Sequence, residues 1–273
     1  MVRRATAAAC LLTACSMFAL LSASALATPG SLEFGKCAKT AGGKFKNAGC
    51  TKLAKTAEEQ KFEWAPLGTT VAFTTAKKAE TGEAVIGTGA GNQVSCSTES
   101  STAGEFGAGS KEQKNIVLQF TGCEQLGTSC QSAGQPSGTI QTFKLDGAPG
   151  VIKKAAKEEK NLDGVDFKGQ TSEVFAEFSC GPAPTVLRGS VIVKAGSIVS
   201  GKFKSSTNKM LNKLVLELGV EAPEKFEGEA PDVLEGSTAG GPFEKVALTL
   251  NAIEQTNPKT TKIELRQCER DVC

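Results

Sequence analysis

The sequence contains no histidine and no tyrosine, and Trp64 is its only tryptophan. The absence of histidine excludes Ser-His-Asp and Cys-His catalysis and removes the commonest metal ligand. The absence of tyrosine removes a further proton donor. An enzyme built from this chain would depend on carboxylates, lysine, serine, threonine or a thiolate. Its core must consist mainly of Val, Leu, Ile, Ala and Phe.

The first residues predict export. Arg3 and Arg4 precede an uncharged stretch over residues 5–26, which ends in the small residues Ala25 and Ala27 on either side of a leucine. This order is typical of a secretory signal peptide over residues 1–27, cleaved after Ala27. The stretch is long enough for an uncleaved anchor. However, alanine and serine dominate its second half and no basic stop follows, which favours cleavage.

A lipoprotein signal is the alternative. Residues 12–15 read Leu-Thr-Ala-Cys, which resembles a bacterial lipobox and would make Cys15 a lipidated first residue. The uncharged run continues well beyond Cys15, where a lipoprotein normally turns polar. Cleavage after Ala27 is therefore the preferred interpretation.

Net charge gives no sign of an anionic partner. Of the 31 basic residues, Arg3 and Arg4 leave with the signal, so 29 remain against 29 acidic residues. A neutral, mixed surface has no electrostatic footprint for nucleic acid or for an anionic membrane. We therefore expect a single exported domain over residues 28–273 that binds neither.

Eight cysteines follow the signal, and an even number in an exported chain predicts disulfides. A metal site is disfavoured because there is no Cys-x-x-Cys pair and no histidine. Closeness in sequence predicts three bonds, and elimination gives the fourth: Cys37 with Cys50, Cys123 with Cys130, Cys268 with Cys273, and Cys96 with Cys180.

The alternative for Cys123 and Cys130 is a redox-active dithiol. Such a pair would need a lowered thiolate pKa and usually has two intervening residues, whereas six separate these cysteines. Nothing basic lies between them, and Glu124 would disfavour the thiolate. A structural bond is therefore the expectation.

Apolar and polar residues alternate with period two in several segments, which predicts strands with one buried and one wetter face. The clearest segments are 116–120, 213–218, 245–251 and 262–266, with weaker ones at 70–74, 139–145, 173–180 and 185–194. Many short strands with Gly/Pro turns predict an all-β fold, an antiparallel β-sandwich or barrel.

Helix signals are few. Residues 151–161 favour a short surface helix, and residues 51–60 favour one or two further helical turns. Stretches rich in Gly, Ser, Thr or Pro predict loops at 97–110, 131–138 and 221–241. The expected fold is therefore a disulfide-braced β-domain with one or two short surface helices.

Three segments partly match catalytic motifs. Residues 196–203 match a P-loop except at Phe203, where Ser or Thr must bind Mg²⁺. Residues 206–209 satisfy Ser-x-x-Lys without its companion motifs. Residues 87–92 carry Asn92 in place of the third glycine of a dinucleotide-binding loop. Turns and loops between strands are the better interpretation, so no cofactor is expected.

Paired carboxylates are the remaining catalytic route. A retaining glycosidase needs two carboxyls about 5 Å apart. Glu173 and Glu177 share a strand face, but four residues of strand span roughly 13 Å. Asp163 and Asp166 lack the repeated oxygens of a calcium loop. Both pairs are expected to be solvated.

Trp64 is a possible ligand contact. It follows Phe62 and precedes Pro66, and a lone tryptophan can provide a stacking platform. The preferred interpretation is a core residue that closes one end of the barrel.

Several motifs resemble those of a group of exported actinobacterial proteins. They are FTGCEQLGTSCQSAGQPSGTIQT, VFAEFSCG, LRGSVIV, KFEGE and IELR, with an early GKF-x-x-AGC segment and an EW dipeptide. The resemblance covers most of residues 28–273 and carries no established activity, so it implies no catalytic residue. The final CERDVC segment lies outside it, which leaves Cys268 and Cys273 without a counterpart in the group.

These observations predict an exported, non-catalytic protein that binds an extracellular ligand or surface partner, or has a structural role there. The alternative is a carboxylate-dependent hydrolase of extracellular polysaccharide. Two converging carboxylates in a cleft would favour the hydrolase.

Overall fold

The computed structural model describes residues 31–77, 82–89, 91–109, 111–157, 160–199, 202–205, 209–211, 213–218, 224–256 and 263–268. The predicted signal peptide, Cys15 and Cys273 lie outside the described residues, and so does the predicted bond between Cys268 and Cys273.

The described residues are dominated by antiparallel strands, which confirms the predicted all-β class. The strands are β1 Ser31–Lys39, β2 Phe62–Ala65, β3 Val71–Ala72, β4 Thr74–Lys77, β5 Ala84–Gly89, β6 Asn92–Cys96, β7 Thr98–Phe106, β8 Gln113–Thr121, β9 Glu124–Gln125, β10 Thr128–Gln131, β11 Thr139–Gln141, β12 Leu145–Lys153, β13 Leu162–Gly169, β14 Val174–Cys180, β15 Ala183–Val199, β16 Lys202–Ser205, β17 Lys209–Leu211, β18 Lys213–Leu218, β19 Leu234–Thr238, β20 Glu244–Lys245, β21 Leu248–Thr256 and β22 Ile263–Cys268.

A closed barrel forms the middle of the molecule. Antiparallel pairings lead from β4 through β7, β8, β12, β13, β15, β18 and β21 back to β4. Alternate residues point inward, as Ile116, Leu118 and Phe120 do on β8, and all three are buried. Of the two architectures that the sequence predicts, the structure therefore has the barrel.

One polar pair sits among the apolar residues of this interior. The side chains of Gln113 and Gln255 are 0% and 1% exposed, and each amide nitrogen donates to the other residue's amide oxygen, at 2.9 and 3.2 Å. The reciprocal hydrogen bonds offset the desolvation of both amides.

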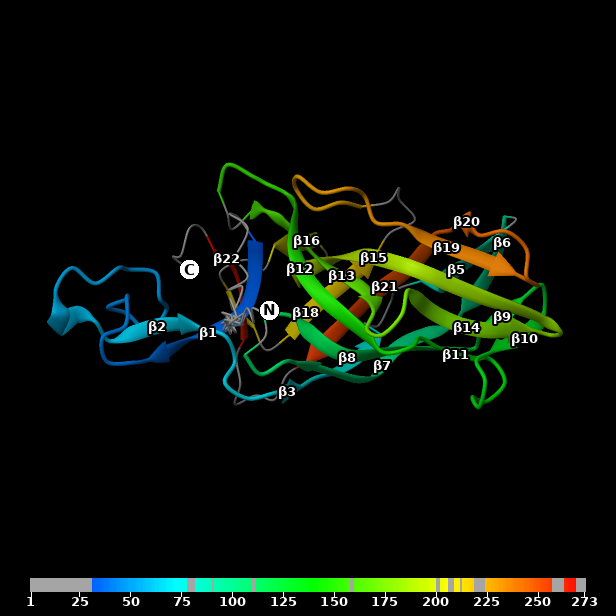
Figure 1. Ribbon diagram of the computed structural model, residues 1–273, viewed down its shortest axis with the longest axis horizontal. Helices are drawn as coiled ribbons and strands as arrows, with labels where there is room; N and C mark the ends of the chain where they lie inside the picture. Colours follow the sequence, from blue (N-terminus) through cyan, green and yellow to red (C-terminus); the bar gives the residue numbers. More distant parts are fainter. Residues whose placement is uncertain are drawn as a thin grey trace, which may run out of the picture.

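One end of the molecule extends beyond this ring because β15 and β21 are long. The first half of β15 leaves the ring and pairs with β14 and β19, while the start of β21 pairs with β5. Further pairings join β5 to β6, β6 to β9, β9 to β10, and β10 to β14. Figure 1 shows β6, β9 and β10 at this end, far from β1 and β2.

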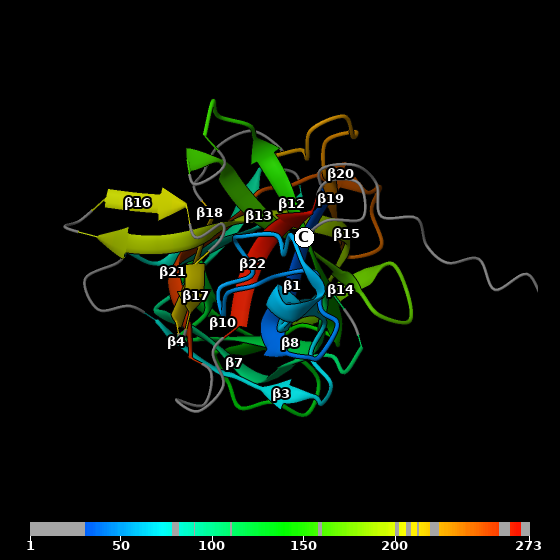
Figure 2. The same ribbon diagram turned by 90° about the vertical axis from the view of Figure 1, so that its left-hand side faces the viewer.

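A smaller sheet in the order β17-β22-β1-β2 caps the opposite end of the barrel. Leu32 and Phe34 of β1 and Leu265 of β22 belong to the barrel core, and the rings of Phe34 and Phe106 meet edge-on at 4.9 Å. Figure 2 looks onto this cap, with β1 and β22 lying across the barrel. Residues 40–61, here called the arm, connect β1 to β2 and project away from the barrel (Figure 1).

Disulfides brace the fold, but two of the predicted pairings are wrong. Cys37 bonds Cys50 as predicted. Cys96 bonds Cys123, and Cys130 bonds Cys180, in place of the predicted Cys96 with Cys180 and Cys123 with Cys130. The reason is strand pairing: Cys130 and Cys180 are cross-strand partners in β10 and β14, with Cα atoms 4.1 Å apart.

Some predicted elements also differ. The helix predicted over 151–161 is wrong, because residues 151–153 complete β12 and pair with β13. The predicted loop at 97–110 contains β7, and the loop at 221–241 contains β19. Between 51 and 60 there is only a short 3₁₀ turn, Ala57–Glu59. In each strand, ladder hydrogen bonds to neighbours outweigh the local preferences of Lys, Ala, Gly and Ser.

The strands predicted on either side of residues 180–185 pair as the hairpin β14–β15. Residues 139–145 do not form one strand, since β11 ends at Gln141 and β12 begins at Leu145. Among the described residues, no helix is long and apolar enough to cross a membrane.

Candidate binding site

The described residues of the P-loop-like and dinucleotide-like stretches lie mostly at the ends of paired strands. Val199 pairs with Lys202, so the P-loop-like stretch forms the hairpin between β15 and β16. Gly89 pairs with Asn92, so the dinucleotide-like stretch forms the hairpin between β5 and β6. Of the Ser-x-x-Lys segment, residues 206–208 lie outside the described part, and Lys209 begins β17.

The prediction that Asp163 and Asp166 are solvated is wrong. Asp163 is 0% exposed and shares the inward face of β13 with Val165 and Phe167. Asp166 lies on the opposite face and is partly buried. The two carboxylates therefore cannot act together. Glu173 and Glu177 are exposed, as predicted.

Asp166 has a different neighbour, Asp232, which no sequence motif indicates. Asp232 Oδ2 accepts a hydrogen bond from the backbone N–H of Ile192 at 2.6 Å, and Ile192 is the cross-strand partner of Asp166. Burial raises the pKa of both carboxyls, and the charge of Asp166 raises that of Asp232 further. Asp232 follows Pro231 in a Gly/Pro-rich segment, where only the fold brings it beside β13.

Trp64 is buried, with 8% of its surface exposed, in a small cluster with Phe45 and Cys50. The guanidinium of Arg266 lies 4.3 Å from the centre of the indole ring. The predicted ligand contact finds no support here, because the arm and Arg266 cover this side chain. Trp64 belongs to β2 of the cap sheet, and its cluster is separate from the barrel core.

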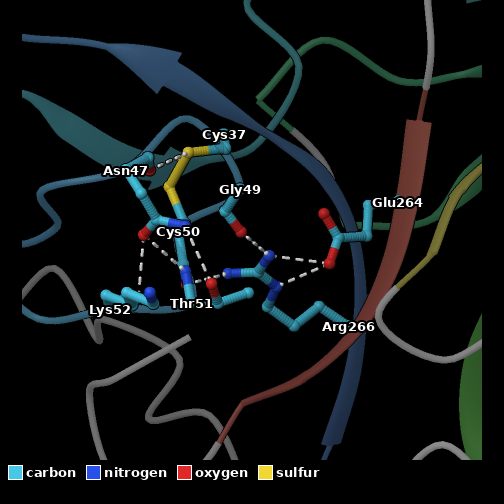
Figure 3. A network of polar contacts seen from close by, with 8 residues as sticks. All are labelled: Cys37, Asn47, Gly49, Cys50, Thr51, Lys52, Glu264 and Arg266. Carbon is cyan, nitrogen blue, oxygen red and sulfur yellow. Dashed lines mark hydrogen bonds and ion pairs between the residues drawn. A yellow bond between two sulfur atoms is a disulfide. The ribbon is translucent and has the colours of Figure 1, made fainter.

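Arg266 ties the arm to the cap sheet (Figure 3). Its Nη1 donates to the carbonyl of Cys50 at 2.8 Å and its Nη2 to that of Gly49 at 2.7 Å, while Nη2 also lies 2.7 Å from Glu264 Oε1. Glu264 and Arg266 of the predicted wetter face are therefore buried, at 2% and 4% exposure. Burial raises the pKa of Glu264, and Arg266 opposes that rise. This network is structural.

At the other end of the molecule, the hairpin β9–β10 presents Leu126. Gln125 pairs with Thr128, so Leu126 and Gly127 form a two-residue turn, with φ of 49° and 78°. Turns with two positive φ values favour Asn-Gly, because non-glycine residues other than Asn and Asp are strained there. The Leu126 side chain is 97% exposed. Neither the backbone conformation nor the exposure of this position favours leucine over other residues.

Two disulfides fix the base of this hairpin. Cys123 precedes β9 and bonds Cys96 at the end of β6, while Cys130 on β10 bonds Cys180 at the end of β14. The backbone N–H of Cys130 also donates to the carbonyl of Cys123 at 2.9 Å. Each side of the hairpin β9–β10 is thus covalently bonded to a different neighbouring strand. We call the hairpin, its two disulfides and the adjoining loop 131–138 the braced end.

A pocket of about 290 Å³ lies beside the Cys130–Cys180 bond, within the braced end and the adjacent hairpin β14–β15. It is lined by Gln131, Ser132, Ala133, Gly134, Glu177, Phe178, Ser179, Pro184, Thr185 and Val186. In sequence these residues form three unrelated short stretches, so no local motif could indicate the pocket.

No protein-family model, curated protein or solved structure matches the chain. Within the described residues there is also no group of three or more Cys, Asp or Glu placed to hold a metal ion. The geometry of the braced end is therefore what supports a function.

Proposed function

We propose that this is an exported, non-catalytic protein that binds a partner outside the cytoplasm through its braced end. Disulfides form and persist in oxidising compartments, so the three bonds among the described residues support an extracellular or periplasmic location. The basic, apolar and small-residue order of residues 1–27 supports export.

The observation that carries the proposal is Leu126. Exposing a leucine fully, in a backbone conformation that it disfavours, gives the fold no evident benefit. A rigid apolar side chain at a hairpin tip is suited to insertion into a partner's pocket, because little conformational entropy is lost on binding. The two disulfides supply that rigidity.

Site-specific photo-cross-linking tests this role in the producing cells. A photoactivatable leucine analogue at Leu126 should give one reproducible adduct in the secreted fraction. The same analogue at Leu53, which is 55% exposed on the arm, is the matched control. Equal labelling from both positions, or none from Leu126, would contradict the proposal.

Export is tested separately by intact-mass measurement of the secreted protein. The expected chain begins at Thr28, with a mass that corresponds to eight cysteines oxidised to four disulfides. A first residue of diacylglyceryl-modified Cys15 would show that the protein is a lipoprotein instead.

A carboxylate-dependent hydrolase of extracellular polysaccharide is the second candidate. Asp166 and Asp232 favour it, because neighbouring carboxyls with raised pKa values are typical of acid–base sites. A hydrogen bond to the barrel wall argues against the hydrolase, since one oxygen of Asp232 already accepts from the backbone N–H of Ile192. Hydrolysis of a polysaccharide panel that is lost in both Asp166→Asn and Asp232→Asn would favour the enzyme.

A further inference from the structure

The strand register determines which side chains line the pocket of the braced end. Glu177 lies opposite Val186, and Ser179 lies opposite Pro184, so these four side chains share the outer face of the hairpin β14–β15. The end of β10 adds Gln131 along one side, and the loop after it adds Ala133 and Gly134. The accessible lining is thus mostly small or apolar, with a single carboxylate.

The buried hydroxyls of the lining are already engaged. Ser132 Oγ donates to the carbonyl of Glu177 at 2.7 Å and accepts from the N–H of Gln141 at 3.1 Å. Thr185 Oγ1 lies 3.2 Å from Thr238 Oγ1. These bonds hold the loop against the hairpin and leave Glu177 as the one charged group of the lining.

Glu177 is exposed, and none of the described cations pairs with it. Arg188, which follows Val186 on the same face of β15, is occupied elsewhere. Its guanidinium lies 2.8 Å from Glu235 and 3.7 Å from the ring centre of Phe243. In the part of the chain that the structure describes, the pocket therefore has a negative charge without a compensating cation, beside apolar walls.

We infer that this pocket binds an ammonium or guanidinium group carried on an aliphatic stem. The charged head would pair with Glu177, and the stem would lie against Val186 and Pro184, as long basic side chains do on apolar surfaces. A partner's lysine or arginine side chain and a free alkylamine share this chemistry. The inference rests on the proposed function of the braced end and adds the chemical class of its ligand.

Titration of the ¹⁵N-labelled, disulfide-intact protein tests the inference. The probes are n-butylammonium, N-acetyl-lysine methylamide and N-acetyl-arginine methylamide, with n-butanol as the neutral analogue. We expect shifts of the amides of 131–134, 177–179 and 185–186, and weaker binding at high salt. Tighter binding of an amino-acid derivative would indicate a partner's side chain as the source. Equal or tighter binding of n-butylammonium would indicate a small amine, and both outcomes support the inference.

Glu177→Gln keeps the size of the side chain and removes its charge, so it should weaken cation binding by about three- to tenfold. Glu177→Lys should abolish binding, because it places a competing ammonium in the pocket. Glu173→Gln changes another exposed carboxylate just before β14 and should leave the affinity unchanged. Equal binding of n-butanol, or an unaltered affinity in Glu177→Gln, would overturn the inference.

The two proposals can fail separately. If Leu126 cross-links to a partner while no cationic probe binds, the braced end still binds but the ligand class is wrong. If cationic probes bind and Leu126 gives no specific adduct, the pocket stands and the role of the hairpin tip is wrong.

Discussion

Arg266 carries a full charge in a place where water has almost no access. It replaces the lost hydration with Glu264, with the carbonyls of Gly49 and Cys50, and with the face of Trp64. Arg266 therefore favours this docked position of the arm, in which two carbonyls of the arm accept from its guanidinium. Most of its stabilising effect comes from avoiding an unpaired charge.

Arg266→Met should therefore destabilise the protein by about 3–5 kcal/mol, because Glu264 is left buried without its cation. Urea unfolding with the disulfides intact gives the value. Trp64 should report release of the arm through a red-shifted emission, since it is the only tryptophan.

The double variant Glu264→Leu with Arg266→Met should recover much of that loss, because a buried ion pair can often be replaced by apolar residues. Lys52→Met, an exposed lysine of the arm, serves as the control. A loss in Arg266→Met no greater than in this control would contradict the structural role of Arg266.

At Leu126 we expect a substitution that raises the free energy of unfolding. Leu126→Asn suits the positive φ and removes an exposed apolar side chain, so stability should rise by about 0.5–1 kcal/mol. The same unfolding measurement checks it, with Thr128→Asn on the neighbouring strand as the control. A decrease in the free energy of unfolding of more than about 0.5 kcal/mol would mean that Leu126 stabilises the fold. It would then contradict the proposed binding role of Leu126.

At the scale of the elements, a strap over residues 224–234 crosses the outside of the barrel. The N–H of Glu227 donates to Val151 at 2.9 Å, the N–H of Ser190 donates to Val233 at 3.1 Å, and Lys194 pairs with Glu224 at 3.5 Å. Phe226 packs on Gly150, where a Cβ would lie 2.5 Å from the ring. Asp232 lies within this strap and faces Asp166 on the barrel wall.

The packing of the strap against the barrel should be more stable at acidic pH than at neutral pH. The pKa values of Asp166 and Asp232 are raised in the fold, mainly by desolvation, and Glu229 and Glu224 add to the rise while Lys168 opposes it at Asp166. A raised pKa means that the fold binds the proton more tightly than the unfolded chain. The stability gained from this tighter proton binding is complete below the ordinary aspartate pKa of 3.8 and is lost as the pH rises through the folded pKa.

Asp232→Asn should therefore stabilise the protein at pH 7 and have no such advantage below about pH 4. The amide oxygen can still accept the Ile192 N–H, so the hydrogen bond is retained. Urea unfolding of both proteins between pH 3.5 and 8 gives the difference. Asp146→Asn, a carboxylate of β12 that is paired with Lys114 at 2.9 Å, is the control and should not stabilise at pH 7. A difference for Asp232→Asn that is independent of pH would contradict this account.

At the scale of the whole molecule, the all-β class and several strands were predictable, because alternation marks a strand wherever one face meets the core. Ile116, Leu118 and Phe120 are the clearest case. Strand β7 was not, since its Gly, Ser and Thr residues resemble a loop and only pairing with β8 and β4 holds them extended.

The braced end was the least predictable part. Closeness in sequence favoured a bond between Cys123 and Cys130, but the barrel brings Cys180 beside Cys130 from a separation of 50 residues. Register between distant strands decides such pairs, and no local pattern encodes it. The same holds for Glu177 and Val186, whose position beside the loop after β10 depends on that register.

Non-reducing peptide mapping of the secreted protein tests the braced end most directly. Cleavage after Glu124 or Leu126 separates Cys123 from Cys130, so their partners can be read independently. We expect peptides that link Cys96 to Cys123 and Cys130 to Cys180, besides Cys37 to Cys50. A bond between Cys123 and Cys130, or free thiols at either, would contradict this pairing and the rigidity of the braced end.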